Sequence, residues 1–204
     1  MSDATVERFG DLAREILSRP ARLGTVRLVA VDGPSGAGKT TFADRLARAL
    51  RDAGTRVEVV HTDDLLDGWD DQFTFWERLE AGILRPMMLG DPGTHLVYDW
   101  RLGRFAGDRT VPVPDVLIVE GGTSARADAY PRLSFSAFLT ADRDVRLRRV
   151  LQRDGPTVEA PLRRWMAAEE SYFAAAATAR RADRVVDGVA DVGHDPENEY
   201  VRLR

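Results

Sequence analysis

Residues 33–40, Gly-Pro-Ser-Gly-Ala-Gly-Lys-Thr, carry the residue types that a binding site for phosphate groups needs. Glycines allow backbone N–H groups to point inward around phosphate oxygens, and the N-terminus of a following helix adds a partial positive charge. The pattern G-x-x-x-x-G-K-[ST] also supplies an amine for the β- and γ-phosphates and a hydroxyl for Mg²⁺. We expect ATP and Mg²⁺ as cofactors, with the nucleotide held by Gly33, Ser35, Gly36, Ala37, Gly38, Lys39, Thr40 and Thr41.

Lys39 is the only lysine of the chain, because 28 of its 29 basic residues are arginine. The arginine excess fits a general bias of composition, which weakens any argument from arginine clusters. A compact ammonium on a flexible stem reaches between phosphates where a planar guanidinium fits poorly. The single lysine therefore supports a catalytic role for Lys39 at the phosphates.

Acidic residues follow two predicted strands at the point where each strand ends. Glu120 closes one apolar run, and Asp63 and Asp64 come after the run 56–60. The carboxyl ends of strands in an open α/β sheet form the edge where ligands bind. We therefore expect Glu120 to hold Mg²⁺ with Thr40, and Asp63 to orient a hydroxyl for phosphoryl transfer. The alternatives are a strand-end acid facing solvent for Glu120 and a helix cap or Asx turn for Asp63 and Asp64.

Arg143, Arg146, Arg149 and Arg153 are spaced three, three and four residues apart, which places them on one face of a predicted helix. In phosphoryl transfer such a face can close over the phosphates and neutralise developing charge. We therefore predict a lid at about residues 142–164, from which Arg146, Arg149 or Arg153 reaches the phosphates. The alternative is a solvated helix face, which the arginine excess favours equally.

Apolar runs and helical periods alternate along the chain, a pattern typical of a parallel sheet with helices on both faces. Predicted strands lie at residues 26–31, 56–60, 115–120, 135–139 and 184–186, and predicted helices at 4–18, 40–53, 73–84, 142–153 and 161–181. Residues 86–113 are predicted as an excursion with two short strands, and an edge strand is predicted at 200–203. We predict an α/β fold of three layers, the P-loop NTPase fold, with a five-stranded, mainly parallel sheet. It forms one domain over residues 1–204, with a C-terminal tail from about 193.

The composition is that of an ordinary globular protein, with 44% apolar and 30% charged residues. A net charge of −4 and a pI of about 5.5 give no basic footprint for nucleic acid. The chain has no cysteine, which excludes disulfides and thiolate metal sites, and no apolar run approaches the ~20 residues of a membrane span. Since residues 2–7 show no secretion signal, we expect a cytoplasmic protein without nucleic-acid or membrane partners. Whether it forms a homo-oligomer stays open.

Together these segments resemble the uridine kinase family of P-loop kinases, a group that also contains phosphoribulokinase and relatives of pantothenate kinase. The resemblance runs from about Val26 to Asp187. It rests on residues 33–40, Thr62-Asp63-Asp64, Tyr98-Asp99-Trp100, Val119-Glu120-Gly121, Arg146-Leu147, Arg149 and Arg153-Asp154. It implies that Asp63 activates the acceptor, that Glu120 is the acid associated with the metal, and that Tyr98 lies near the acceptor.

The chain departs from the family pattern where the family recognises its acceptor. Leu65 and Leu66 stand where Phe-Tyr is usual, and Arg101 to Arg104 replace a segment that holds a histidine. We therefore carry over nucleotide binding but not uridine specificity. Arg101 and Arg104, with Asp63, Asp64 and Tyr98, form the predicted substrate site. The two arginines suggest an acceptor with an anionic group, such as a phosphate or carboxylate, and surface arginines in a biased composition are the alternative.

The predicted activity is Mg²⁺- and ATP-dependent transfer of the γ-phosphoryl group to a hydroxyl of a small molecule, by a phosphotransferase of the uridine kinase-like kind. One alternative is a P-loop ATPase or switch protein that acts with a protein partner. Another is a binding protein without chemistry. The acceptor itself and the choice between ATP and GTP stay open.

Aromatic residues near these segments have a simpler interpretation. Trp165, Glu169 and Tyr172 share one helical face, a spacing typical of a packing face with a polar rim. Trp69 and Phe73 flank the segment after Asp64, where stacking on an acceptor base and core packing are equally consistent with the sequence.

Overall fold

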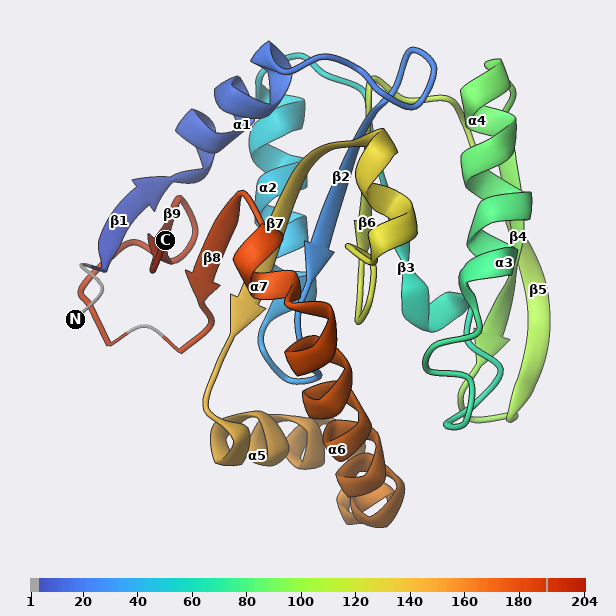
Figure 1. Ribbon diagram of the computed structural model, residues 1–204, viewed down its shortest axis with the longest axis vertical. Helices are drawn as coiled ribbons and strands as arrows, with labels where there is room; N and C mark the ends of the chain where they lie inside the picture. Colours follow the sequence, from blue (N-terminus) through green and yellow to red (C-terminus); the bar gives the residue numbers. More distant parts are fainter. Residues whose placement is uncertain (1–3, 190) are drawn as a thin grey trace.

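The computed structural model describes residues 4–189 and 191–204, and its centre is a seven-stranded sheet in the order β1-β9-β8-β7-β2-β6-β3 (Figure 1). The strands are β1 (Thr5–Arg8), β2 (Arg27–Asp32), β3 (Val57–His61), β6 (Val116–Glu120), β7 (Leu133–Thr140), β8 (Arg184–Asp187) and β9 (Glu199–Arg202). From β8 to β3 all neighbours pair in parallel, whereas β9 and β1 are antiparallel additions. The predicted α/β class is confirmed. The predicted count of five strands describes only the parallel part and is wrong for the whole sheet.

The two added strands come from the ends of the chain. Residues 4–18 do not form one helix, because β1 occupies Thr5–Arg8 and helix α1 (Phe9–Ser18) begins at Phe9. Thr5 lies opposite Arg202 in the antiparallel pair of β1 and β9. The apolar spacing near the N-terminus fits a strand and a helix alike. The choice depends on β9, the strand that pairs with β1 and lies almost a full chain length away.

Helices cover both faces of the sheet, as predicted. The bounds are α2 (Lys39–Asp52), α3 (Trp76–Leu79), a π-helical segment (Glu80–Leu84) and α4 (Arg85–Leu89). Along β2, Val29 and Val31 join the core under α1 and α2, whereas Leu28 and Ala30 face the core under α3 and α4. Since side chains alternate along a strand, a strand buried on both faces needs an unbroken apolar run.

One predicted helix lies elsewhere along the chain than expected. The sequence predicts a helix at 73–84, but helical structure begins at Trp76 and continues through the π-helical turn to Leu89. Pro86 lies in the first turn of α4, where a missing N–H costs little. Gly90, with a φ of 87°, ends the helix in the left-handed conformation.

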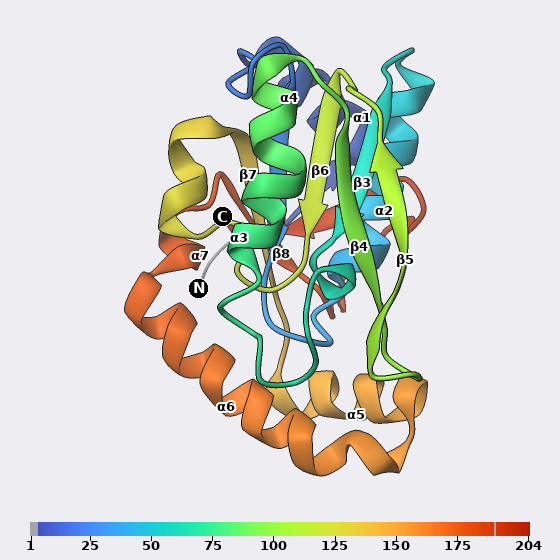
Figure 2. The same ribbon diagram turned by 90° about the vertical axis from the view of Figure 1, so that its right-hand side faces the viewer.

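A hairpin stands beside the free edge of β3 (Figure 2). It consists of β4 (Gly93–Asp99) and β5 (Arg104–Val111), which confirms two strands within residues 86–113. Arg109 of the hairpin donates to the Val59 carbonyl at 3.0 Å and pairs with Glu58 at 3.2 Å. These contacts cover an edge that would otherwise present unpaired backbone groups.

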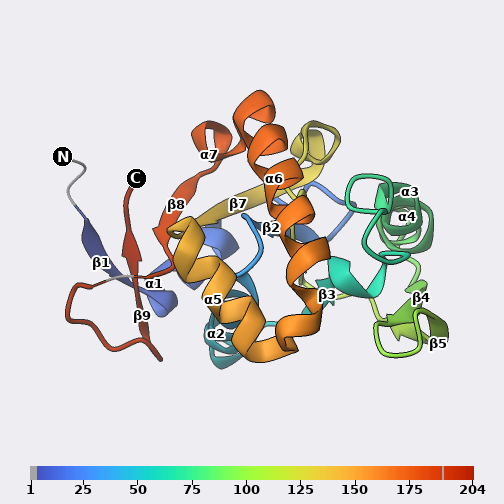
Figure 3. The ribbon, with the colours of Figure 1, turned by 90° about the horizontal axis from the view of Figure 1, so that it is seen from below.

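Two helices cross below the carboxyl edge of the parallel strands (Figures 1 and 3). They are α5 (Arg143–Asp154) and α6 (Glu159–Ala176), joined by a short 3₁₀ turn (Pro156–Val158), and the short α7 (Thr178–Arg181) leads into β8. Asp142 caps α5 by accepting from the N–H groups of Asp144 and Val145. None of the helices in the described part of the chain has the length and apolar composition to span a membrane.

We predict that Phe9→Ala lowers the free energy of unfolding by about 3–5 kcal/mol. Phe9 is buried, and its ring lies 5.1 Å from that of Phe42 and 5.2 Å from that of Tyr200, so it joins α1, α2 and β9. Urea denaturation measures the loss. Leu89→Ala, at a side chain that is 76% exposed, is the control and should change stability by less than about 0.5 kcal/mol. Equal effects of the two substitutions would contradict this packing.

Candidate active site

The glycine loop of residues 33–38 connects the end of β2 to the start of α2 in a conformation that requires glycine. Gly33, Gly36 and Gly38 have φ values of 140°, 78° and 97°. A Cβ on Gly33 would lie 2.3 Å from the Leu139 carbonyl oxygen, and one on Gly36 would lie 2.6 Å from that of Arg146. The loop is therefore packed tightly against β7 and α5. Helix α2 begins directly after it at Lys39, with its N-terminal N–H groups at the loop.

A cavity of about 200 Å³ borders this loop, and we call it the loop cavity. Lys39 lies in its wall and donates to the Pro34 carbonyl at 3.2 Å. Several segments far apart in the sequence meet here and bring together Lys39, Thr40, Asp63, Glu120, Arg149 and Arg153. The structure thus brings the predicted phosphate and metal residues and one predicted acceptor residue, Asp63, to one place at the carboxyl edge.

Thr40 and Glu120 face each other in the loop cavity. The Thr40 hydroxyl donates to Glu120 Oε1 at 3.2 Å, and His61 Nδ1 lies 2.6 Å from the same oxygen. The hydrogen bond to the Glu120 carboxylate raises the pKa of His61. A hydroxyl and a carboxylate are oxygen ligands that suit Mg²⁺. The described residues contain no cluster of three or more His, Asp or Glu side chains arranged for a metal. A Mg²⁺ ion here would therefore take its remaining ligands from phosphate and water.

Asp63 follows β3 directly in a single 3₁₀ turn (Thr62–Asp64). Its side chain lines the loop cavity and is accessible from it. The protein packed around it raises the pKa of the carboxyl group, and the charge of Lys39 opposes that shift. Asp64 does not line the loop cavity. Of the two acids, only Asp63 therefore faces the phosphate loop.

The three predicted lid arginines have different surroundings. Arg149 lines the loop cavity and donates to the Gly36 carbonyl at 3.2 Å and the Gly188 carbonyl at 2.9 Å. Arg153 also lines the cavity and pairs with Asp154 at 2.7 Å. Arg146 is buried outside the lining of the cavity and donates to the Ser35 carbonyl at 3.4 Å. Arg149 and Arg153 are thus within the site, whereas Arg146 holds the phosphate loop through the Ser35 carbonyl without reaching the loop cavity.

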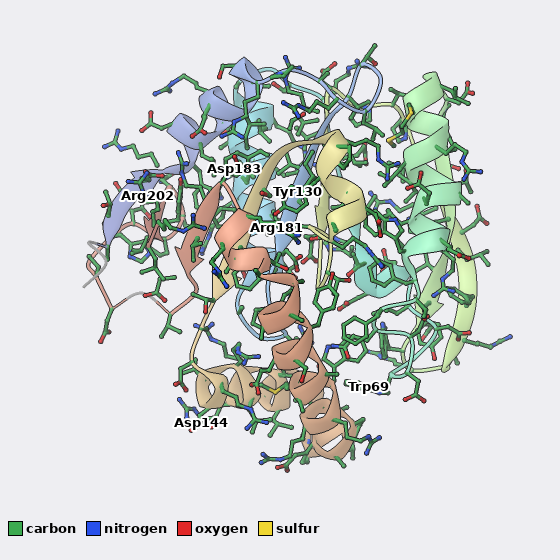
Figure 4. The ribbon with its side chains drawn as sticks, viewed as in Figure 1. Trp69, Tyr130, Asp144, Arg181, Asp183 and Arg202 are labelled. Carbon is green, nitrogen blue, oxygen red and sulfur yellow. The ribbon has the colours of Figure 1, made fainter. Side chains whose placement is uncertain are left out.

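A second cavity of about 500 Å³, the tryptophan cavity, shares Ser35, Asp63 and Arg153 with the first. Three indole rings form much of its wall: Trp69 lies 5.5 Å from Trp100 and 5.7 Å from Trp165, edge to face. Figure 4 shows Trp69 beside α6, the helix that carries Trp165. Aliphatic side chains add to the wall, namely Leu66, Val150, Val158 and Leu162, and Arg101 and Asp154 add charged groups.

The remaining predicted substrate residues lie on or near the tip of the β4–β5 hairpin. Arg101 lines the tryptophan cavity, whereas Arg104 does not. Tyr98 is buried behind Trp100, with ring centroids 5.1 Å apart. The Trp100 indole donates to the Asp63 carbonyl at 3.2 Å, which ties this wall to the turn that carries the carboxylate.

A third cavity of about 410 Å³, the β8 cavity, lies on the other side of the phosphate loop. Gly38, Thr41 and Arg149 separate it from the loop cavity, since they line both. Its wall combines apolar side chains with the backbone that follows β8 and includes Leu139, Val186, Gly188, Tyr200 and Val201. The phosphate loop therefore borders the loop cavity on one side and the β8 cavity on the other.

Asp32 supports the site but is not among the predicted residues. It is fully buried at the end of β2 and accepts from the N–H groups of Gly33 at 2.7 Å, Thr123 at 2.8 Å and Ala125 at 2.9 Å. Burial raises the pKa of Asp32 to about 6. Its position at the end of an apolar strand, as for Glu120, is the signal that would have identified it.

Glu169 is the second residue that the sequence does not reveal. The prediction of a polar rim is wrong for this side chain, because it is buried and lines the loop cavity. It accepts from the backbone N–H of Ser35 at 2.9 Å. The only sequence signal is an acid one helical turn after Trp165, on the same face.

A family model described as an AAA domain matches residues 29–171. The chain belongs to this family. The AAA domain also has the fold of a "possible uridine kinase" from Bacillus stearothermophilus, with a TM-score of 0.66 and 24% identity over 87% of this chain and 96% of that one. A proposed fructose transport system kinase from Silicibacter sp. TM1040 is similar, with a TM-score of 0.62 and 21% identity over 82% and 94%. No curated protein matches the chain in sequence. The predicted resemblance to uridine kinase-like P-loop kinases is thus confirmed at the level of the fold.

The raised pKa of Asp32 predicts a pH dependence of stability. The folded protein holds a proton on Asp32 up to about pH 6, whereas the unfolded chain releases it near 3.8. Stability relative to Asp32→Asn, which cannot titrate, should therefore fall by roughly 3 kcal/mol as the pH rises from about 4 to above 6. Urea unfolding of both proteins across this range measures it. If the free energies of unfolding of the wild type and Asp32→Asn change with pH by the same amount, the prediction is wrong.

Proposed function

We propose that this AAA domain transfers the γ-phosphoryl group of ATP, bound with Mg²⁺, to a hydroxyl of a small molecule. The observation that carries the proposal is the shared wall of two cavities. Asp63 lines both the loop cavity, which would hold the phosphates, and the tryptophan cavity, which would hold the acceptor. A carboxylate at that boundary is within reach of a hydroxyl that approaches a terminal phosphate.

The loop side of the site suits a nucleoside triphosphate. Backbone N–H groups of residues 36 and 38–41, at the N-terminus of α2, would bind phosphate oxygens, and Lys39 would reach the β- and γ-phosphates. Thr40 and Glu120 would hold Mg²⁺, which neutralises charge on the transferred group when bound. The β8 cavity, with its apolar wall next to Gly38 and Thr41, would take the nucleoside end.

Asp63 would act as the base. In the transfer, a bond forms between the acceptor oxygen and the γ-phosphorus, and the bond from that phosphorus to the oxygen bridging to the β-phosphate breaks. The proton of the acceptor hydroxyl moves to the Asp63 carboxylate. Arg149 and Arg153, which line the loop cavity from α5, would stabilise the negative charge on the phosphates. Arg146 would keep the phosphate loop in place. Residues 142–164, which carry these arginines, would act as the lid over the phosphates.

The tryptophan cavity favours an acceptor with an apolar body and one anionic group. Its wall has three indole rings and four aliphatic side chains, with Arg101 at the hairpin tip. An ADP-release screen with Mg²⁺-ATP over nucleosides, sugars, pantothenate-like acids and amino-sugar antibiotics tests this. We expect the hydroxy acids with apolar bodies to stimulate release most. Stimulation by a protein alone would favour the P-loop ATPase or switch.

Lys39→Ala should lower ATP turnover by at least about a hundredfold, because one preorganised charge at the transferring phosphate is lost. The fold should persist, since Lys39 makes a single hydrogen bond to a backbone carbonyl of its own loop. ADP release and circular dichroism measure the two effects. Lys39→Arg is the control for charge and should not restore turnover. Full activity of Lys39→Ala would end the assignment.

Asp63→Asn should lower kcat for the acceptor found in the screen by about 10²–10⁴-fold, the range for loss of a general base. Asp64→Asn is the matched substitution one residue later, and it should leave kcat within about twofold because Asp64 lines neither cavity. The reverse order of effects would mean that Asp64 activates the acceptor.

A further inference from the structure

The Glu169 carboxylate is an anion on the phosphate loop. Only 2% of the residue is exposed, and its two oxygens lie 2.9 and 3.0 Å from the Ser35 backbone nitrogen. The Ser35 hydroxyl donates to Oε1 at 2.7 Å. Backbone N–H groups of such loops bind phosphate oxygens. The Glu169 carboxylate is therefore bound by the same kind of donor that binds the phosphates of a nucleotide.

The same carboxylate reaches the wall of the tryptophan cavity. Trp165, one turn earlier on α6, donates from its indole nitrogen to Glu169 Oε1 at 2.9 Å. Trp165 lines both cavities and contacts Trp69 in the second. Glu169 Oε1 therefore accepts hydrogen bonds both from Ser35 of the phosphate loop and from Trp165 in the wall of the tryptophan cavity.

A buried anion in this position needs a compensating charge. The Arg146 guanidinium lies 3.8 Å from Glu169 Oε2 and is itself buried. Arg146 also donates to the Ser35 carbonyl at 3.4 Å. Ser35 is thus held through its N–H and hydroxyl by α6 and through its carbonyl by α5, and the lid helices are joined to the loop by paired buried charges.

We propose that Glu169 is a positioning residue that couples nucleotide binding to the acceptor wall. Phosphate bound to the neighbouring loop N–H groups repels the carboxylate and weakens its hydrogen bonds to Ser35. Because Trp165 is bonded to the same oxygen, a shift of the carboxylate changes the indole hydrogen bond and moves the wall of the tryptophan cavity. This inference rests on the proposed function, since it requires that the loop binds nucleotide phosphates.

The test is the indole ¹⁵N–¹H NMR spectrum of the full chain labelled at tryptophan, which gives one signal for each of its four tryptophans. Trp165→Phe identifies the Trp165 signal. On addition of Mg²⁺-ADP to the wild type, we expect this signal to shift. In Glu169→Gln the signal should lie elsewhere before ADP is added and should no longer respond. ADP affinity by calorimetry should stay within about tenfold of wild type, because the other loop donors remain.

Glu170→Gln is the matched control. Glu170 is the next residue on α6, its side chain is 47% exposed, and it pairs with Arg143 and Arg146 rather than with the loop. We expect the Trp165 signal and its response to ADP to match the wild type in this variant. A role of Glu169 in folding alone predicts lower stability of Glu169→Gln with no selective loss of the ADP response.

The outcomes separate this inference from the proposed function. If calorimetry finds no ADP binding to the wild type, the proposed function fails and takes the inference with it. If ADP binds but the Trp165 signal does not shift, or still shifts in Glu169→Gln, only the coupling fails. Should Glu169→Gln not fold, Ser35→Ala removes one bond to the carboxylate and leaves the charge pair intact. It should reduce the ADP-induced shift, and an unchanged shift overturns the proposal.

Discussion

The backbone of residues 33–38 is the constraint on which the rest of the site depends. To turn its N–H groups toward one point, the loop needs three glycines with positive φ, and to stay in place it needs close packing. The Leu139 and Arg146 carbonyls lie where a Cβ on Gly33 or Gly36 would be. The loop is thus packed closely against β7 and α5, and α5 cannot be placed independently of the phosphate loop.

A second constraint is the parallel order of the central strands. Because β6 pairs with β2 on one side and β3 on the other, and all three run in the same direction, the residues that follow them arrive at one edge. Asp32, His61 to Asp63 and Glu120 meet there although they are far apart in the sequence. The acids then divide by their surroundings. Asp32 is enclosed by backbone N–H groups, Glu120 faces a hydroxyl and a histidine, and Asp63 borders open space.

The tryptophan cavity has a different construction. Its wall is assembled from the segment before α3, the hairpin tip and the lid helices, which contribute Trp69, Trp100 and Trp165. None of these segments belongs to the parallel sheet, so their positions depend on mutual packing and on a few polar links. The Trp100 bond to the Asp63 carbonyl and the Trp165 bond to Glu169 are two such links, and both reach residues that line the loop cavity.

The sequence by itself determined the phosphate loop, the five parallel strands and the acids at their carboxyl ends. These features are local: glycine spacing, an apolar run and its last residue are each read within about ten positions. The edge strand predicted at 200–203 corresponds to β9, whereas only the tertiary structure decided that β1 extends the sheet, because its partner β9 lies almost 200 residues away. It also decided which of the four arginines line the loop cavity and that Glu169 is buried against the phosphate loop. The physical reason is that each of these outcomes depends on contacts between segments that are far apart in the sequence. The helical face that α6 presents, and what covers it, depends on how the lid packs across the sheet edge, and no spacing within the helix encodes that contact.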